Sequence, residues 1–158
     1  CSTSREAEKA SKYLKNANIE ICPWGIHEPD KIEDSIWKED IRKKLNLPAE
    51  QKILIFLGRL NHVKRILETA KAFHQLQPQG WTLLIVGYPE EISITQGIEK
   101  LADNHSIYYH PPVDSFEKWR FLAAADAFIN LSYKENFGYA VAEAALLGLP
   151  ILISDGVD

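Results

Sequence analysis

The stretch "KILIFLGRLNHVK", Lys52–Lys64, decides the fold of this chain. It opens with a short, continuous apolar run that ends at a glycine, which is the pattern of a strand buried on both faces. Apolar residues then recur at helical spacing as far as the stop signal "QPQG", 77–80. A buried strand followed directly by a helix predicts one unit of a parallel sheet.

The same alternation of strands and helices continues on both sides of this stretch. Further strands are expected at 19–22, 81–87, 106–110, 127–131 and 150–154. Helices are expected at 4–16, 37–45, 62–76, 91–104, 114–125 and 139–147. This pattern predicts an α/β fold, a Rossmann-like parallel sheet with helices on both faces. In such sheets ligands bind beyond the carboxyl ends of the strands, which is where the candidate motifs lie.

The composition is that of one ordinary globular domain. The chain has 158 residues, of which 46% are hydrophobic and 25% charged, and its net charge is −4. This charge gives no support to a nucleic-acid partner. No apolar run approaches the ~20 residues that span a bilayer, so we expect no transmembrane segment. Cys1 and Cys22 form neither a disulfide framework nor a metal cluster, and they fit a reducing, cytoplasmic setting.

The first candidate site is the loop from Gly58 to Lys64. A strand, a glycine, a loop and a helix form a layout that attracts anions, because N–H groups at a helix start are unpaired. Arg59 offers paired donors and Lys64 a point charge, so the two cations suit a diphosphate. Both are equally well interpreted as solvated surface residues. The loop has neither a P-loop pattern nor a three-glycine fingerprint, which argues against nucleotide hydrolysis and NAD binding.

The second candidate site is the stretch "SYKENFGYAVAEAALLGLP", 132–150, which carries Glu135 and Glu143 around Gly138. A carboxylate accepts one hydrogen bond on each oxygen and so suits the vicinal hydroxyls of a sugar. Glycine lets a ligand approach backbone N–H groups at the helix start. Glu143 lies among small apolar residues, where burial without a partner is costly. Alternatively, Glu143 faces solvent along one edge of the helix.

His110 and Pro111 end the strand expected at 106–110, on the same ligand edge of the sheet. They either line a pocket or are plain loop residues. The tryptophans are expected to be packing residues rather than stacking platforms for a ligand: Trp24, Trp37, Trp81 and Trp119. There is no Asp-x-Asp and no His/Cys/Asp cluster in the sequence, so we expect no metal site and no cofactor.

Together these residues resemble the C-terminal, nucleotide-sugar-binding domain of the family 4 retaining glycosyltransferases, which have the GT-B fold of two facing Rossmann-like domains. Four segments carry the resemblance in order, over roughly residues 19–154: "ICPWGI", "FLGRLNHVK", "LLIVG" and "LSYKENFGYAVAEAALLGLPIL". The last is similar to the family's signature of two glutamates separated by seven residues, followed by Gly-x-Pro. This sequence departs from the family at Trp24, where asparagine is usual, and at Arg65, where glycine is usual.

The resemblance implies a role for each matched residue. Arg59 and Lys64 would hold the donor diphosphate and stabilise the departing nucleoside diphosphate, and Glu135 would bind hydroxyls of the transferred sugar. These three are the implied catalytic residues, and fixed cations at the leaving group would remove the need for a metal. Glu143 would bind the ribose hydroxyls. The other implied donor-binding residues would contact sugar, phosphate or base: Gly58, His110, Pro111, Asn136, Phe137, Gly138 and Tyr139.

The resemblance also implies a domain arrangement and a function. Residues 1–18 are expected to be the tail end of an amino-terminal domain with a linker helix, and residues 19–158 a donor-binding domain truncated at its C-terminus. The implied enzyme is a hexosyltransferase that transfers a sugar from a nucleoside-diphosphate sugar to a glycan, a lipid-linked sugar or a small molecule bound by the missing domain. The fragment alone is expected to be inactive, and the whole protein cytoplasmic or peripheral to a membrane.

Two other functions remain open at this point. One is a nucleotide-sugar isomerase or epimerase of the same fold. The other is a non-catalytic module that binds sugar nucleotides.

Overall fold

Five parallel strands form one sheet at the centre of the chain. The computed structural model describes residues 1–27, 29, 34–47 and 50–157. The strands are β1 (Lys52–Arg59), β2 (Trp81–Tyr88), β3 (Ile107–His110), β4 (Ala127–Asn130) and β5 (Ile151–Ile153). They lie in the order β3-β2-β1-β4-β5, and every neighbouring pair is parallel. This topology confirms the expected α/β, Rossmann-like sheet.

The order of the strands reverses at β1. The chain passes from β1 outward through β2 to β3, and then returns to place β4 on the other side of β1. In open α/β sheets such a reversal leaves a crevice at the carboxyl ends of the two strands involved. The segments that follow β1 and β4 are therefore neighbours at this edge, and they carry the two candidate motifs.

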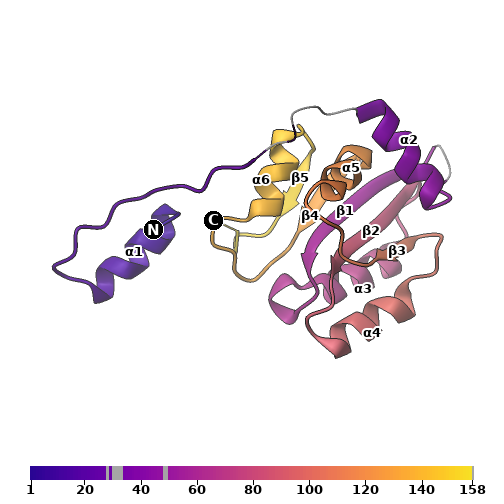
Figure 1. Ribbon diagram of the computed structural model, residues 1–158. Helices are drawn as coiled ribbons and strands as arrows, with labels where there is room; N and C mark the ends of the chain where they lie inside the picture. Colours follow the sequence, from indigo (N-terminus) through magenta and orange to yellow (C-terminus); the bar gives the residue numbers. More distant parts are fainter. Residues whose placement is uncertain (28, 30–33, 48–49, 158) are drawn as a thin grey trace.

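Helices cover both faces of the sheet (Figure 1). One face is covered by α2 (Asp34–Lys44), α5 (Glu117–Ala124) and α6 (Tyr139–Leu146), and the other by α3 (Ile66–Leu76) and α4 (Ile92–Leu101). The helix expected at 62–76 is divided at Arg65 into a short 3-10 turn, η1 (His62–Lys64), and α3. The other expected helices of this region are present, with ends that shift by a few residues.

Side chains alternate between the two faces along the central strands. On β1, Ile53 and Ile55 belong to one buried cluster and Phe56 to the other, and all three are almost fully buried. On β2, Leu84 and Leu83 divide in the same way. Full burial of a side chain of this size contributes roughly 1.5–3 kcal/mol. The continuous apolar runs predicted both strands correctly because neither face of the sheet meets water here.

Asp126 ties the start of β4 to β1 and α2. Its Oδ2 accepts a hydrogen bond from the backbone N–H of Ile53 at 2.8 Å and pairs with Arg42 at 3.0 Å, while Oδ1 pairs with Lys38 at 2.7 Å. Burial alone would raise the pKa of Asp126, but the bonds from Lys38 and Ile53 and the nearby Arg42 charge lower this pKa overall. The carboxylate thus fixes the beginning of β4 against its neighbour in the sheet.

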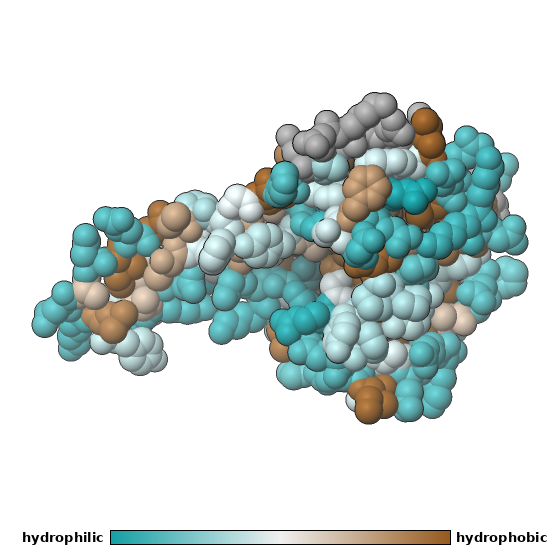
Figure 2. All heavy atoms as spheres, in the orientation of Figure 1, coloured by the Kyte–Doolittle hydropathy of each residue, from teal (hydrophilic) through white to brown (hydrophobic). Residues whose placement is uncertain are grey.

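The amino-terminal segment projects from the rest of the molecule (Figure 1). It contains α1 (Ser4–Tyr13), whose Arg5 Nη1 donates a hydrogen bond to the backbone oxygen of Asp155 at 3.2 Å. On the face drawn in Figure 2, hydrophilic residues predominate, and hydrophobic residues occur in small separate groups, several of them on this projection. None of the helices that the structure describes combines the length and hydrophobicity needed to cross a bilayer.

The prediction of a strand at 19–22 is wrong, because residues 14–27 contain no strand. Instead, the amino group of Cys1 donates to the backbone oxygen of Glu20 at 3.1 Å, and the N–H of Cys22 donates to the backbone oxygen of Cys1 at 2.8 Å. These two bonds have the pattern of one parallel bridge between Cys1 and Ile21. A segment as short as residues 19–22 forms a strand only where a neighbouring strand continues the pairing.

Candidate functional site

An open cleft with a volume of about 1040 Å³ lies at the carboxyl ends of β1 and β4. The β1 wall contains Gly58, Arg59 and Lys64, and the β4 wall contains Asn130 and residues 134–140. Residues of the amino-terminal segment complete the lining. The cleft therefore occupies the point where the strand order reverses, and both candidate motifs open into it.

Arg59 is the last residue of β1 and lies in the open part of the cleft. Its side chain is 62% exposed, and its Nη1 donates a hydrogen bond to Oε1 of Glu90 at 2.9 Å. A guanidinium carries five N–H donors in a fixed fork, so this contact leaves other donors for an anionic ligand. Arg59 is thus a cation oriented by one carboxylate.

The turn η1 sets the position of Lys64. Asn61, directly before the turn, is buried, and its Oδ1 accepts a hydrogen bond from the backbone N–H of Lys64 at 3.0 Å. Arg65, directly after the turn, has a φ of 53°, in the left-handed region that glycine favours. The Arg65 guanidinium lies 4.5 Å from the centroid of the Tyr133 ring, which follows β4. This cation–π contact joins the two walls and offsets part of the backbone strain.

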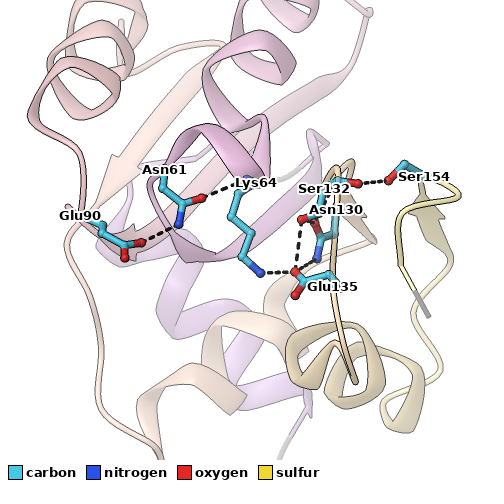
Figure 3. Close-up of polar contacts among 7 residues, drawn as sticks. All are labelled: Asn61, Lys64, Glu90, Asn130, Ser132, Glu135 and Ser154. Atoms are coloured by element: carbon cyan, nitrogen blue, oxygen red, sulfur yellow. Dashed lines mark hydrogen bonds and ion pairs between the residues drawn. The ribbon is translucent and has the colours of Figure 1, made fainter. Parts of the chain in front are cut away.

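Glu135 meets Lys64 between the two walls (Figure 3). The Lys64 Nζ and Glu135 Oε1 form an ion pair, and the two side chains are only 14% and 13% exposed. Asn130 Nδ2 also donates to this oxygen at 3.1 Å, and Ser132 Oγ lies 3.2 Å from it. Burial alone would raise the pKa of Glu135, but the contacts with Lys64, Asn130 and Ser132 lower this pKa overall. The carboxylate is therefore ionised at neutral pH.

A hydrogen-bond network holds the loop that carries Glu135. The Ser132 hydroxyl lies 2.5 Å from Oδ1 of Asn130, and Ser154 Oγ donates to the backbone oxygen of Ser132 at 2.5 Å (Figure 3). The N–H of Glu135 donates to the backbone oxygen of Gly156 at 2.8 Å. A Cβ at Gly156 would overlap backbone carbonyl oxygens of the loop, so glycine is required for this close approach. The segment after β5 therefore supports the site.

The start of α6 forms the end of the β4 wall. Gly138 precedes the helix with a φ of 68°, again in the left-handed region. The first helical hydrogen bond runs from the N–H of Ala142 to the oxygen of Gly138 at 3.0 Å. Tyr139 and Ala140 also line the cleft, and their N–H groups precede this bond and have no acceptor within the helix. Together with the helix dipole, they favour an anion or an electron-rich oxygen at this end.

Glu143 lies apart from the cleft lining. Its side chain is 8% exposed and forms an ion pair with Lys118 Nζ on α5. The alternative in which Glu143 faces solvent is therefore wrong, and the buried carboxylate has the partner that its apolar surroundings require. The structure brings Arg59, Lys64 and Glu135 into one cleft but does not add Glu143 to that group.

His110 and Pro111 also lie outside the cleft lining. They come at and after the end of β3, the edge strand on the far side of β2. The His110 ring packs against Phe121 with centroids 4.7 Å apart, and its Nδ1 lies 2.7 Å from the Pro111 oxygen. A place for these two residues beside a nucleotide base stays a prediction. The other implied donor-binding residues line the cleft: Gly58, Asn136, Phe137, Gly138 and Tyr139.

Several residues around the cleft did not stand out in the sequence. Asn61, Glu90, Asn130 and Ser132 all bond to the predicted site residues. Their common signal is a polar side chain within a few residues of the carboxyl end of a strand. The expectation that Trp24 is a packing residue is wrong, because this side chain is 61% exposed and lines the cleft.

The charges of the cleft favour an anionic ligand. Arg59, Lys64 and Lys134 line it together with Glu6 and Glu135, so that cationic side chains outnumber carboxylates. Within the described ranges, no group of three or more His, Cys, Asp or Glu side chains is arranged to hold a metal ion.

The sequence matches the family model described as "Glycosyl transferases group 1" over residues 37–158. A curated relative, the putative teichuronic acid biosynthesis glycosyltransferase TuaC of Bacillus subtilis (strain 168), is 28% identical over 152 residues. The alignment covers 96% of this chain and 37% of the relative. The chain therefore spans less than two fifths of the length of TuaC.

Solved structures share the fold. A sucrose-phosphate synthase from Thermosynechococcus elongatus aligns with a TM-score of 0.74 at 24% identity, covering 98% of this chain and 40% of its own. Anabaena Alr3699/HepE, in complex with UDP and glucose, aligns with a TM-score of 0.62 at 23% identity, covering 77% of this chain and 34% of its own. At these identities the likeness establishes the fold, a Rossmann-like domain that forms part of a GT-B architecture.

Proposed function

This chain belongs to the glycosyl transferases group 1 family, and we propose that it binds the nucleoside-diphosphate sugar donor of a glycosyltransferase, with the diphosphate and the sugar in the cleft. During transfer, the bond between the anomeric carbon and the diphosphate oxygen breaks, and the oxygen of an acceptor hydroxyl bonds to that carbon with retention of configuration. The hydroxyl proton leaves with the nucleoside diphosphate.

The acceptor is a glycan, a lipid-linked sugar or a small molecule, held by the rest of a protein that works in the cytoplasm or at a membrane surface.

One observation carries this proposal: the cleft at the switch point joins two cations from the β1 wall to a carboxylate and a helix start from the β4 wall. Arg59 and Lys64 supply positive charge for a diphosphate, and Glu135 supplies an acceptor for sugar hydroxyls. A ligand that is anionic at one end and rich in hydroxyls at the other fits this arrangement. The UDP and glucose bound by Anabaena HepE support it.

The ion pair between Lys64 and Glu135 suggests how the donor enters. A diphosphate oxygen replaces Glu135 as the partner of Lys64, and the released carboxylate turns to the hydroxyls of the transferred sugar. Neither charge is left unpaired in the exchange, which matters because both side chains are largely buried.

The same cations act on the leaving group. Negative charge grows on the diphosphate as the anomeric bond breaks, so fixed donors near it stabilise the transition state more than the ground state. Arg59, Lys64 and the free N–H groups at the start of α6 supply these donors, and no metal ion is required. The three residues proposed as catalytic are Arg59, Lys64 and Glu135.

We assign the nucleoside end to the region between α5 and α6. Glu143 accepts the ribose hydroxyls there after Lys118 moves aside, and the loop at His110 and Pro111 borders the base. The resemblance to the family's two-glutamate signature supports this assignment, and Lys118, the partner of Glu143, has a side chain that is 26% exposed.

Calorimetry on the whole protein with UDP, GDP and ADP tests the proposal. We expect one of these nucleotides to bind, and Lys64→Ala to weaken its binding by about 1.5–3 kcal/mol, the range for a charge-assisted hydrogen bond. Lys71→Ala is the matched control, because Lys71 is an exposed lysine on α3 that does not line the cleft. Equal affinities for the wild type, Lys64→Ala and Lys71→Ala would contradict the proposal.

Product analysis separates transfer from the two other functions. Incubation with donor and an acceptor panel should yield a glycosylated product and free nucleoside diphosphate. A rearranged donor formed without acceptor would indicate an isomerase or epimerase instead. Tight donor binding without any turnover would indicate a binding module.

A further inference from the structure

Glu90, in the loop after β2, contacts the β1 wall through both carboxylate oxygens. Its Oε1 accepts a hydrogen bond from Arg59 Nη1 at 2.9 Å, and its Oε2 accepts one from Asn61 Nδ2 at 2.5 Å. Asn61 in turn accepts from the backbone N–H of Lys64. Figure 3 shows this line of contacts from Glu90 through Asn61 to Lys64 and on to Glu135.

Hydrogen-bond polarity leaves Asn61 one orientation. An ionised carboxylate only accepts and a backbone N–H only donates, so the amide must turn its Nδ2 to Glu90 and its Oδ1 to Lys64. Asn61 is only 7% exposed, so the opposite orientation would be costly. Its oxygen would then face the Glu90 carboxylate and its Nδ2 the Lys64 N–H, with no water to pair with either. Glu90 and the Lys64 N–H therefore require the same orientation of the amide that anchors η1, and Glu90 holds its Nδ2 end.

We propose that Glu90 and Asn61 are positioning residues for the diphosphate-binding cations. Glu90 orients the Arg59 guanidinium directly and orients the Lys64 turn through the Asn61 amide. The inference rests on the proposed function of the cleft. It gives the loop after β2 the role of orienting two cations of the β1 wall, which neither wall of the cleft does by itself.

Exchanging the amide of Asn61 with the carboxylate of Glu90 tests this network. In Asn61→Asp, two carboxylates face each other, and their repulsion should weaken the anchor of η1 even though the aspartate can still accept from the Lys64 N–H. In the double variant Asn61→Asp/Glu90→Gln, the side-chain amide introduced at position 90 can donate its N–H to the new aspartate, and its oxygen can accept from Arg59. The aspartate still accepts from the Lys64 N–H, so each contact is restored with the same total charge.

Two measurements on the whole protein follow. For the nucleoside diphosphate that binds the wild type among UDP, GDP and ADP, we expect Asn61→Asp to raise the Kd at least about tenfold and the double variant to recover most of this loss. In the free protein, hydrogen exchange at the Lys64 amide should speed up in Asn61→Asp and slow again in the double variant. Glu39→Gln is the control, since Glu39 is an exposed α2 residue paired with Lys43.

Each outcome either supports or overturns the positioning role. Rescue of both affinity and amide protection in the double variant supports the proposal, because a loss of fold stability alone would not be reversed by exchanging the groups. A double variant no better than Asn61→Asp, or an Asn61→Asp protein that behaves like Glu39→Gln, overturns it. If the wild type binds none of the nucleotides, the proposed function of the cleft fails, and with it the role at the diphosphate. Amide exchange would still decide whether Glu90 orients η1.

Discussion

Lys64 and Glu135 lie 71 residues apart in the sequence and form an ion pair between the β1 and β4 walls of the cleft. Each residue neutralises the other in a place that water reaches poorly. Removing one therefore leaves a largely buried charge behind, whereas removing both does not.

Stability measurements should reveal this coupling. We expect Lys64→Met to lower the free energy of unfolding by about 1.5–3 kcal/mol, because the Glu135 carboxylate loses its charged partner. The double variant Lys64→Met/Glu135→Gln should recover part of that loss. Urea denaturation at neutral pH measures Lys64→Met, Glu135→Gln and the double variant, with Lys71→Met as the control. Simple additivity of the two single substitutions would show that the pair is uncoupled.

Acid should weaken the wild type through Glu135. The pKa of this group is lowered from its ordinary value of 4.5 by Lys64, Asn130 and Ser132. A pKa that is lower in the folded state gives stability that is present above the unfolded value and lost as pH falls through the folded value. Glu135→Gln should therefore destabilise the protein more at pH 7 than at pH 3. A destabilisation that is the same at both pH values would contradict this.

Asp126→Asn should lower the stability of the fold without changing nucleotide binding in the cleft. The substitution removes charge-assisted bonds to Arg42 and Lys38 and weakens the bond from the Ile53 N–H, so we expect a loss of about 1.5–3 kcal/mol in unfolding free energy. Because the pKa of Asp126 is lowered in the folded state, this loss should also shrink as the pH falls below about 4. Nucleotide affinity, measured where the variant is fully folded, should stay near that of the wild type. A large loss of affinity would mean that Asp126 acts on the cleft.

Two glycines with similar backbone conformations form a matched pair. Gly138 has a φ of 68° beside the cleft, and Gly80 has a φ of 74° away from it, with no atom within 4 Å of an added Cβ. Alanine at either position should cost about 1–2 kcal/mol of stability, because left-handed backbone is strained for a residue with a Cβ. Only Gly138→Ala should also weaken nucleoside diphosphate binding. Thermal unfolding and calorimetry on both variants check these expectations.

The assignment of ribose to Glu143 can be tested with paired ligands. If Glu143 accepts ribose hydroxyls, Glu143→Gln should weaken binding of a nucleoside diphosphate more than binding of its 2′-deoxy analogue. The reason is that the deoxy ligand already lacks one of the donors. Calorimetry with both ligands gives the comparison. The same loss for both would place Glu143 in a structural pair with Lys118.

The sheet could be predicted from the sequence where burial dictates composition. Runs such as 52–58 and 81–87 are apolar on both faces because helices cover both faces. Such a composition can be recognised from the segment alone. The segment 19–22 has isoleucines on either side of Glu20 but forms no strand, because pairing depends on a neighbour that a local pattern does not reveal.

The candidate site was less accessible to prediction. Gly58, Arg59, Lys64 and Glu135 could be placed near one another because strand ends meet at one edge of a parallel sheet. The ion pair between Lys64 and Glu135 could not, since it depends on β4 lying next to β1 and on side-chain reach. The role of Glu90 could not be predicted for the same reason. Glu90 follows β2, and only the register of β2 with β1 places it beside Arg59.

The pairing of β1 with β4, through Leu54 with Ala127 and Ile55 with Phe128, has a consequence for biosynthesis. A nascent chain that has left the ribosome only as far as β3 already contains Arg59 and Lys64, but it has no opposing wall. Ligand recognition can therefore begin only after β4 and the segment after β5 have emerged and docked. A bound nucleotide would protect finished molecules from proteolysis and could not guide the earlier steps of folding.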